Sequence, residues 1–495
     1  MEALDWLVIG VFFLALIGII VWVVRQKQND SADYFLGGRD ATWLAIGASI
    51  FASNIGSEHL IGLAGAGASS GMAMAHWEIQ GWMILILGWV FVPFYSRSMV
   101  YTMPEFLERR YNPQSRTILS VISLVSYVLT KVAVTVYAGG LVFQQVFGIK
   151  ELWGIDFFWI AAIGLVVLTA LYTIFGGMKS VLYTSVLQTP ILLLGSLIIL
   201  VLGFKELGGW DEMMRVCGAV TVNDYGDTMT NLIRSNDDAN FPWLGALIGS
   251  AIIGFWYWCT DQFIVQRVLS GKNEMEARRG TIFGAYLKLL PVFLFLIPGM
   301  IAFALHQKYI GAGGEGFLPM LANGTANADA AFPTLVAKLL PAGVKGLVVC
   351  GILAALMSSL ASLFNSSAML FTIDFYKRFK PETPEKKLVG IGQIATIVIV
   401  VLGILWIPIM RSVGDVLYTY LQDVQSVLAP GIAAAFLLGI CWKRTSAQGG
   451  MWGLISGMVI GLTRLGAKVY YSNAGEVADS TFKYLFYDMN WLFFC

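Results

Sequence analysis

Long apolar runs alternate with short polar stretches along almost the whole chain. A run of about 20 apolar residues is long enough to cross a bilayer core as a helix. Runs of this kind predict twelve spans, near residues 5–24, 42–68, 72–95, 117–147, 154–175, 179–203, 243–267, 279–305, 344–376, 388–410, 415–442 and 449–467. The pattern therefore predicts an all-α membrane protein.

The loops between these spans differ in their basic content. If the loops alternate between the two sides, the side that holds Arg25, Arg109 and Lys377 carries more Lys and Arg than the other. Short cytoplasmic loops are enriched in these residues, so we expect the N-terminus outside the cell. The chain begins without the basic segment of a signal peptide, and we expect its first apolar run to be an uncleaved span. It stops shortly after a new apolar start at Trp491, which indicates a missing C-terminal part.

The second predicted span contains the polar run 52–59. Its serines and Asn54 compete with helical hydrogen bonds, and Gly56 weakens the helix further. Ionisable groups in a span are default functional candidates because their insertion is costly, and here Glu58 stands beside His59. Polar groups can also simply bind neighbouring helices, but two adjacent ionisable residues are hard to explain in that way. We expect the helix to break in this run.

A second interrupted span, around 254–262, lies about 200 residues further along the chain. Matching interruptions in two halves indicate an inverted-repeat transporter whose site lies at the bilayer midplane. The predicted organisation is a leading span and cytoplasmic linker (1–40), a first five-span repeat (41–203), an extracellular loop (204–242), a second five-span repeat (243–442) and an additional C-terminal span with a truncated end (443–495). Five spans per repeat require the two halves to insert with opposite topology.

Two other deep charges, Glu78 and Lys288, are flanked by aromatic residues. Carboxylate, ammonium and aromatic groups together suit a hydroxylated ligand such as a sugar. The alternative is an ion pair between Glu78 and Lys288 that only ties two spans together. Lys131 also lies near a span centre, where it could pair or extend to the interface.

Small and hydroxylated residues share one helical face in the run 354–362, at spacings of three and four. Hydroxyl groups there, with carbonyl oxygens released by the break near Gly56, could enclose Na⁺, a hard cation that prefers oxygen. Spacing alone favours the other interpretation, a small-residue packing face between helices.

Composition supports a membrane protein and excludes one class of partner. Hydrophobic residues make up 57% of the 495 residues and charged residues only 13%. The formal net charge of +1 gives no large basic field, which argues against nucleic-acid binding. The five cysteines are an odd number and mostly stand in apolar stretches, so we infer no disulfide framework.

At these residues the sequence resembles the sodium/solute symporters, in the branch of sodium/glucose and sodium/inositol cotransporters. Five stretches carry the resemblance: 47–59, 101–106, 256–267, 357–366 and 429–434. The resemblance implies a leucine-transporter-like inverted repeat of five plus five spans, with one leading span and at least one extra C-terminal span. It also implies transport by alternating access.

The resemblance assigns residues to two ligands. It places Na⁺ between the carbonyl oxygens of Ala52, Ile55 and Ala355 and the hydroxyls of Ser358 and Ser359, which reverses the preference from spacing alone. The residues that it assigns to the sugar are Asn54, His59, Glu78, Lys288 and Gln422, with Tyr257 as an inner gate that stacks on the sugar ring and Trp258 beside it. It assigns Glu58 no ligand, and we expect a structural or gating partner for that residue.

Three positions depart from the family pattern. Ser185 stands where the family usually has Asp, a residue associated with a second sodium ion in some members, so one coupled Na⁺ is expected. Gly254 and Thr419 replace larger or more polar sugar ligands, so two sugar hydroxyls are expected to be bound differently or through water.

The implied function is inward Na⁺-coupled uptake of a glucose- or galactose-type sugar across the plasma (cell inner) membrane, without a required protein partner. A sodium/myo-inositol symporter is the alternative, since the run 57–59 also resembles the inositol members. A sugar sensor or uncoupled channel on the same fold is a different class, and would lack Na⁺-dependent uphill uptake. A membrane enzyme using Glu58, His59 and Glu78 as acid and base is a further class, but no nucleophile or metal set accompanies them.

Overall fold

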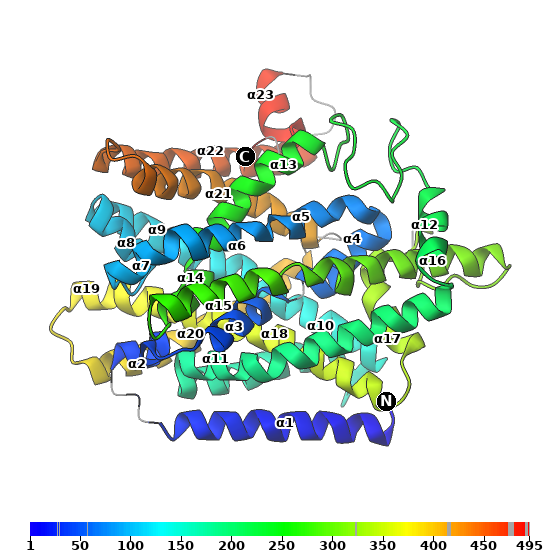
Figure 1. The fold of residues 1–495 in the computed structure, drawn as a ribbon, viewed down its shortest axis with the longest axis horizontal. Helices are drawn as coiled ribbons and strands as arrows, with labels where there is room; N and C mark the ends of the chain where they lie inside the picture. Colours follow the sequence, from blue (N-terminus) through cyan, green and yellow to red (C-terminus); the bar gives the residue numbers. More distant parts are fainter. Residues whose placement is uncertain are drawn as a thin grey trace.

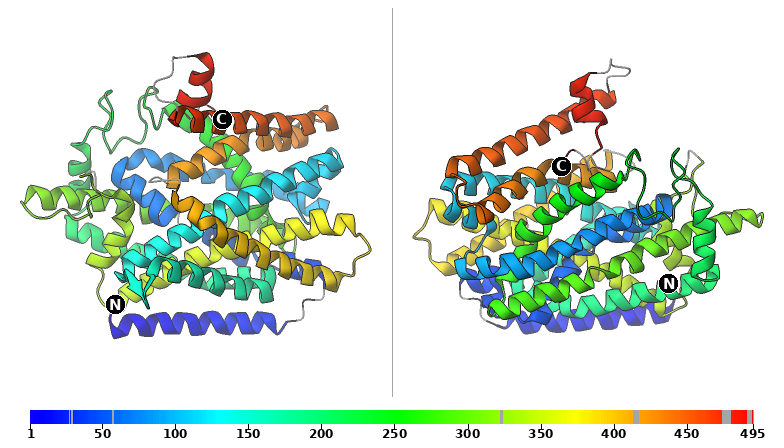
Figure 2. Two further views of the ribbon diagram at one scale, coloured as in Figure 1. Left: turned by 180° about the vertical axis from the view of Figure 1, so that it is seen from behind. Right: turned by 45° about the horizontal axis from the view of Figure 1, so that its top comes forward.

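The computed structural model describes residues 1–26, 28, 30–56, 58–321, 324–412, 417–473, 480–490 and 494. Within these ranges it does not describe the side chains of residues 129, 130, 145, 409–412, 417–424, 469, 472 and 473. Figure 1 shows long helices that run roughly side by side in layers, and Figure 2 shows the same layers from two other directions. In all three views α1 (Ala3–Val24) lies along one edge of the bundle and α22 (Ala447–Asn473) along the opposite edge.

The first part of the chain forms helices up to the end of the sixth predicted span, with one short hairpin. After α1 its elements are α2 (Ser31–Leu36), η1 (Gly37–Arg39), α3 (Trp43–Asn54), η2 (Glu58–Leu63), α4 (Ala64–Ser69), η3 (Gly71–Met74), α5 (Ala75–Ile79), η4 (Gln80–Trp82), α6 (Met83–Ile86), η5 (Leu87–Phe91), α7 (Val92–Ser98), α8 (Met103–Arg110), α9 (Pro113–Ser126), η6 (Tyr127–Val132), α10 (Ala133–Phe147), the antiparallel strands β1 (Glu151–Leu152) and β2 (Ile155–Asp156), and α11 (Phe157–Leu207).

The second part repeats the pattern of long helices joined by shorter pieces. Its elements are α12 (Trp210–Gly218), α13 (Trp243–Gly254), η7 (Phe255–Thr260), α14 (Gln262–Leu269), α15 (Glu274–Leu287), η8 (Val292–Leu296), α16 (Ile297–Gly311), η9 (Ala328–Ala330), α17 (Ala331–Leu339), α18 (Val344–Met369), η10 (Leu370–Tyr376), α19 (Lys377–Phe379), α20 (Glu385–Ser412), α21 (Leu417–Cys441), α22, α23 (Thr481–Lys483) and η11 (Tyr484–Asp488).

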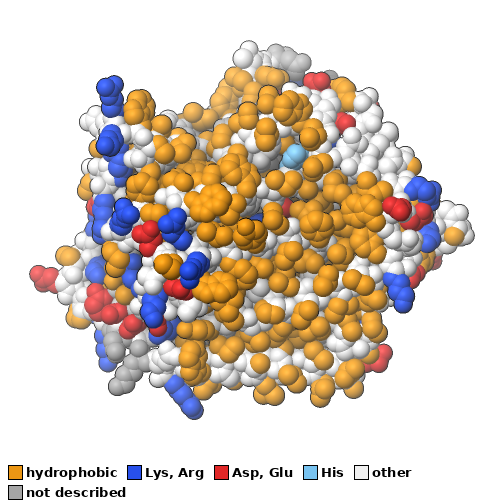
Figure 3. Space-filling view, viewed as in Figure 1, with side chains coloured by type: hydrophobic (Ala, Val, Ile, Leu, Met, Phe, Trp, Pro, Cys, Tyr) orange, Lys and Arg blue, Asp and Glu red, His pale blue; other side chains and the backbone are white. Residues whose placement is uncertain are grey.

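Among the described residues, seven helical segments are long and apolar enough to cross a membrane, and three shorter apolar helices accompany them. The predicted spans 154–175 and 179–203 fall together in α11, whose 51 residues are interrupted at Gly177 by φ 53° and ψ −149°. This conformation is essentially restricted to glycine, so Gly177 marks the turn between the two predicted spans. Hydrophobic side chains cover the middle of the face in Figure 3, while many Lys and Arg gather toward the end where α8 and α19 lie.

Both predicted interruptions lie inside their polar runs. Helix α3 ends at Asn54, Ile55 is extended (φ −77°, ψ 102°), and helical structure resumes at Glu58. In the second half η7 ends at Thr260, Asp261 is extended (φ −73°, ψ 128°), and α14 begins at Gln262. A helix that ends leaves carbonyl oxygens without their usual partners. The two breaks therefore expose backbone groups in the middle of the bundle.

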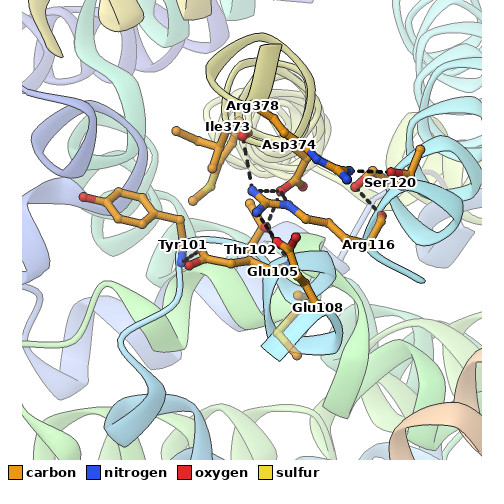
Figure 4. Close-up of polar contacts among 12 residues, drawn as sticks. Tyr101, Thr102, Glu105, Glu108, Arg116, Ser120, Ile373, Asp374 and Arg378 are labelled. Carbon is orange, nitrogen blue, oxygen red and sulfur yellow. Dashed lines mark hydrogen bonds and ion pairs between the residues drawn. The ribbon is translucent and has the colours of Figure 1, made fainter. Parts of the chain in front are cut away.

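A polar cluster around Arg116 ties α8 and α9 to η10 (Figure 4). Arg116 on α9 donates from Nε to Asp374 Oδ1 at 2.7 Å and from Nη1 to Glu108 Oε2 at 2.6 Å. The hydroxyl of Thr102 also donates to Asp374 Oδ1, at 2.8 Å. Asp374 is buried, so these donors compensate a charge that water does not reach.

Arg116→Leu is expected to destabilise the protein by about 3–5 kcal/mol, because it leaves the buried Asp374 carboxylate without its cation. The measurement is the melting temperature of the purified variant in detergent. Arg378→Leu is the control: Arg378 is exposed and bonds the Thr117 hydroxyl at 2.6 Å, a contact worth about 0–1 kcal/mol. Equal losses in the two variants would contradict a structural role for the Arg116 cluster.

Close backbone contact joins α4 to the helix formed by η8 and α16. A methyl group on Gly299 would meet the carbonyl oxygen of Ala64, and one on Gly67 would meet that of Leu296, both at less than contact distance. Small residues that let helix backbones approach are typical of packing in membranes. These glycines therefore set the distance between the two helices.

Gly299→Ala is expected to lower stability by about 1–3 kcal/mol or more, because the helices must separate to accept the methyl group. Gly164→Ala is the matched control, since nothing lies within 4 Å of its added Cβ. The fraction of monodisperse protein in size-exclusion chromatography after heating measures the difference. If both variants behave alike, close packing at Gly299 is not important.

Candidate functional site

Three predicted sugar-site residues meet in one buried cluster. His59 lies on η2, Glu78 on α5, and Lys288 directly follows α15. Lys288 Nζ lies 2.6 Å from Glu78 Oε2 and 2.8 Å from His59 Nε2, and His59 Nε2 lies 3.2 Å from Glu78 Oε1. All three residues are at most 4% exposed. The ion pair considered as the alternative is thus formed, and an imidazole completes a triangle with it.

The cluster borders a small cavity of about 20 Å³. Its lining residues are Asn54, Glu58, His59, Trp77, Gln80, Ile253, Tyr257, Trp258, Lys288 and Gln425. A cavity of this size holds about one water molecule. The side chains around it must therefore move apart before a sugar-sized solute can enter.

Tyr257 and Trp258 on η7 form an aromatic wall of this cavity. The Asn54 amide donates to the Tyr257 hydroxyl at 3.0 Å, and the two rings meet edge to face with centroids 4.9 Å apart. Lys288 Nζ lies 5.6 Å from the Trp258 ring centroid, and Lys131 Nζ lies 4.6 Å from that of Tyr257. The wall therefore stands between two cations, which favour contact with aromatic faces.

Lys131 is paired rather than extended to the interface. Its ammonium lies 2.7 Å from Asp261 Oδ2, and the Tyr127 hydroxyl donates to the other oxygen of the same carboxylate. Asp261 also caps α14 by accepting from the Phe263 backbone N–H at 3.2 Å. Sequence analysis missed Asp261 as the partner, although it lies in the interrupted run 254–262.

Gln80 is a second side chain that the sequence analysis missed. It stands two residues after Glu78 and is buried, and a Cβ added at Gly254 would lie 2.6 Å from its Oε1. This Oε1 has no hydrogen-bond partner among the described residues. The space that Gly254 leaves is thus filled by a free amide oxygen. The sequence signal was the glycine at position 254, where relatives have a larger or more polar residue. Its missing side chain indicated that a residue of a facing helix could fill the space.

The predicted sodium residues lie where α18 (Ala355, Ser358 and Ser359) packs against the break in α3 (Ala52 and Ile55). The Ser359 hydroxyl donates to Ser53 O at 2.7 Å and lies 3.4 Å from Ile55 O, so it meets carbonyl oxygens that the helix end has released. The Ser358 hydroxyl lies 3.3 Å from that of Ser185 on α11. All five predicted ligand residues are buried. Neutral hydroxyl and carbonyl oxygens of this kind fit a monovalent hard cation.

The side chain of Gln422, a predicted sugar ligand, lies outside the described residues. The same holds for the side chain of Thr419, which departs from the family pattern.

Glu58 is half-buried and lines two cavities of about 20 Å³ each. One cavity is shared with the sugar-site residues and the other with Ser53, Lys131 and Ser359. Glu58 therefore stands between the two candidate ligand sites.

Comparison with known proteins gives the fold and the family. The structure matches that of a Na⁺-coupled sialic acid symporter in a substrate-bound outward-open state, with a TM-score of 0.79 at 22% identity over 100% of this chain and 94% of that one. It has a TM-score of 0.53 to MhsT in complex with L-phenylalanine, at 13% identity over 85% of this chain and 96% of that one. The structure thus has a leucine-transporter-like fold, as predicted.

A model of the sodium:solute symporter family matches residues 34–461. The chain is 38% identical over 479 residues to human sodium/myo-inositol cotransporter 2, covering 94% of this chain and 70% of that relative. It is also 38% identical over 512 residues to rat sodium/glucose cotransporter 2, covering 99% and 75%. The chain therefore belongs to the sodium:solute symporter family, and it is a sodium-coupled solute symporter. The resemblance seen in the sequence is confirmed.

Proposed function

We propose that the chain takes up a sugar of the glucose or galactose type together with one Na⁺. The main support is the buried triangle of His59, Glu78 and Lys288, which lies beside the aromatic wall of Tyr257 and Trp258. A carboxylate accepts hydrogen bonds from hydroxyl groups, an ammonium donates to them, and an aromatic face packs on the apolar face of a sugar ring. The match to sodium/glucose cotransporters supports this substrate class.

We assign the sugar to two groups of residues. Its hydroxyls bind to Asn54, His59, Glu78, Lys288 and Gln422, and its ring packs on Tyr257, the inner gate, with Trp258 beside it. Gln80 is added to this set, because its free amide oxygen lies where a larger residue at position 254 would otherwise stand. A buried free acceptor favours a ligand that brings a hydroxyl to it.

We assign Na⁺ to the carbonyl oxygens of Ala52, Ile55 and Ala355 and the hydroxyls of Ser358 and Ser359. The ion then bridges the unwound turn of the first repeat and α18 of the second. Since Asn54 follows Ala52 by two residues and reaches Tyr257, the same turn contacts both ligands. Binding of Na⁺ is thereby expected to order the sugar site and to hold the outward-open form.

The proposed cycle is alternating access in which sugar closes the outer side and the Tyr257 side then opens inward. One charge that moves through 100 mV supplies about 2.3 kcal/mol, and a tenfold Na⁺ gradient adds about 1.4 kcal/mol. Tight coupling to one ion then supports accumulation of roughly 500-fold. A much larger accumulation would require a second ion and would contradict the single-ion assignment.

We place the protein in the plasma membrane with its N-terminus outside. The gathering of Lys and Arg at the end near α8 and α19 supports the inner assignment of that end. The symporter acts on its solute without converting it chemically and contacts lipid around its apolar belt. No protein partner is needed in this account.

Initial rates of radiolabelled uptake into proteoliposomes test the substrate, with glucose, galactose and myo-inositol each measured with and without an inward Na⁺ gradient. We expect Na⁺ to stimulate uptake of a hexose most strongly. Preference for myo-inositol would favour the alternative substrate, which the match to sodium/myo-inositol cotransporters supports. Absence of Na⁺ stimulation for every solute would instead favour a sensor or channel.

A further inference from the structure

Arg267 is a buried cation that belongs to neither the proposed sugar site nor the proposed sodium site. It lies on α14, the second half of the broken seventh span, and is 1% exposed. Its Nε donates to Ser49 Oγ at 3.1 Å and to Ser53 Oγ at 2.9 Å, both on α3. Its Nη1 and Nη2 have no acceptor among the residues whose side chains the structure describes. Burying a guanidinium without a hydrogen-bond acceptor costs free energy, so we expect an acceptor beside Arg267.

The described side chains around Arg267 do not provide an acceptor for its two Nη groups. Ser49 Oγ accepts from Arg267 Nε at 3.1 Å and lies 3.4 Å from the Ser185 hydroxyl. Its own hydroxyl proton has no acceptor among the described residues. The Ser185 hydroxyl donates its proton to Val181 O at 2.6 Å. The site therefore combines positive charge with donors that lack described acceptors, namely the two Nη groups of Arg267 and the hydroxyl of Ser49.

The carboxylate nearest in sequence is already occupied. Asp261 stands at the start of the same half-helix, and its two oxygens accept from Lys131 and from Tyr127. Within the described part of the chain no ion pair joins Arg267 to an Asp or Glu. The aromatic ring of Phe263, 5.0 Å from the Arg267 guanidinium carbon, covers one side of the group but accepts only weakly.

We propose that a small monovalent anion of the halide type, chloride in physiological solution, binds between the Arg267 guanidinium and the Ser49 hydroxyl, beside Ser185. Such an ion accepts several hydrogen bonds at once and neutralises the guanidinium charge. Its position is next to the proposed sodium site, since Ser185 Oγ lies 3.3 Å from Ser358 Oγ. Anion binding itself does not depend on the proposed sugar, whereas its effect on Na⁺ rests on the proposed sodium ligands.

The anion is expected to raise Na⁺ affinity, because it removes an uncompensated positive charge from beside the cation. Coupling between two neighbouring ligand sites is typically 5- to 150-fold in affinity, so we expect replacement of chloride by gluconate to raise the half-saturating Na⁺ concentration about fivefold or more. Gluconate is too large for a site enclosed by three helices.

Ser185→Asp is a test that adds a charge instead of removing a residue. It would place a carboxylate beside Ser49 and toward Arg267, and so supply the missing acceptor from the protein itself. Ser185→Asn is the matched control, with almost the same size and no charge. We expect S185D to lose its response to chloride and S185N to keep it.

The experiment compares the purified full chain in choline chloride and choline gluconate at equal ionic strength. We expect chloride to raise the melting temperature of the wild type by about 2 °C or more, because it binds the folded state. Na⁺ titration of tryptophan fluorescence in the same two anions then measures the change in Na⁺ affinity. Chloride should affect both readings in wild type and S185N, and neither in S185D.

Equal melting temperatures of the wild type in the two salts would overturn the proposal and leave only water at Arg267. A chloride response that persists in a folded S185D would overturn it as well. If S185D does not fold, the wild-type comparison decides. A chloride-dependent melting temperature together with no Na⁺-driven uptake of any solute would support the anion site while rejecting the proposed function.

Discussion

Replacing Glu78 with glutamine is expected to lower the rate constant for Na⁺-driven sugar uptake at low sugar concentration by about 10- to 150-fold. A hydrogen bond to a charged group is worth about 1.5–3 kcal/mol, and each 1.4 kcal/mol is a factor of ten. The substitution also leaves the Lys288 ammonium, now 2.6 Å from the carboxylate, buried without its counter-charge. Initial uptake rates over a range of sugar concentrations in proteoliposomes measure the effect.

The double variant with Glu78→Gln and Lys288→Met separates a ligand role from a structural one. Neutralising both members of a buried ion pair is often close to neutral for stability, so this variant should fold better than either single variant. If Glu78 and Lys288 bind sugar, uptake stays low although the melting temperature recovers. Recovery of uptake together with stability would mean that the ion pair only ties the helices together.

Ser359→Ala is expected to raise the half-saturating Na⁺ concentration about tenfold or more while leaving the maximal uptake rate at saturating Na⁺ similar. The variant removes one of the two proposed hydroxyl ligands and the group that now meets Ser53 O and Ile55 O at the helix break. Loss of one charge-assisted contact of about 1.5 kcal/mol accounts for this factor. Uptake at constant sugar and varied Na⁺ gives the measurement.

Ser367→Ala is the matched control on the same helix, α18. Ser367 is equally buried, but its hydroxyl has no partner among the described residues. Its removal should leave the Na⁺ dependence unchanged. A similar loss of Na⁺ affinity in S367A would show that any lost hydroxyl on α18 disturbs the protein, and would contradict the assignment of Ser359.

The breaks in the two spans could be predicted from sequence because their causes are local. Asn54, Gly56 and the serines weaken a helix through contacts within a few residues, and the structure ends α3 at Asn54. The position of Glu78 and Lys288 at one site followed from the cost of charge in a bilayer, which forces such groups to meet partners. These arguments need no knowledge of how the helices pack.

Pairings across long distances in the sequence could not be predicted in this way. Lys131 meets Asp261 across 130 residues, and Gln80 fills the space at Gly254 from another helix. Nothing in the spacing of these residues fixes which helix faces which. The excess of donors around Arg267 is likewise visible only when α14 and α3 lie side by side.

The proposed mechanism rests on coupling between sodium and sugar through the segment from Ala52 to His59, which contains the helix break at Ile55. Its most direct test is to titrate Na⁺ in the presence and absence of saturating sugar, and sugar in the presence and absence of saturating Na⁺, using tryptophan fluorescence of the purified protein. We expect each ligand to raise the affinity for the other by the same factor, about fivefold or more, as thermodynamic linkage requires. Affinities for Na⁺ and sugar that do not depend on each other would contradict the account.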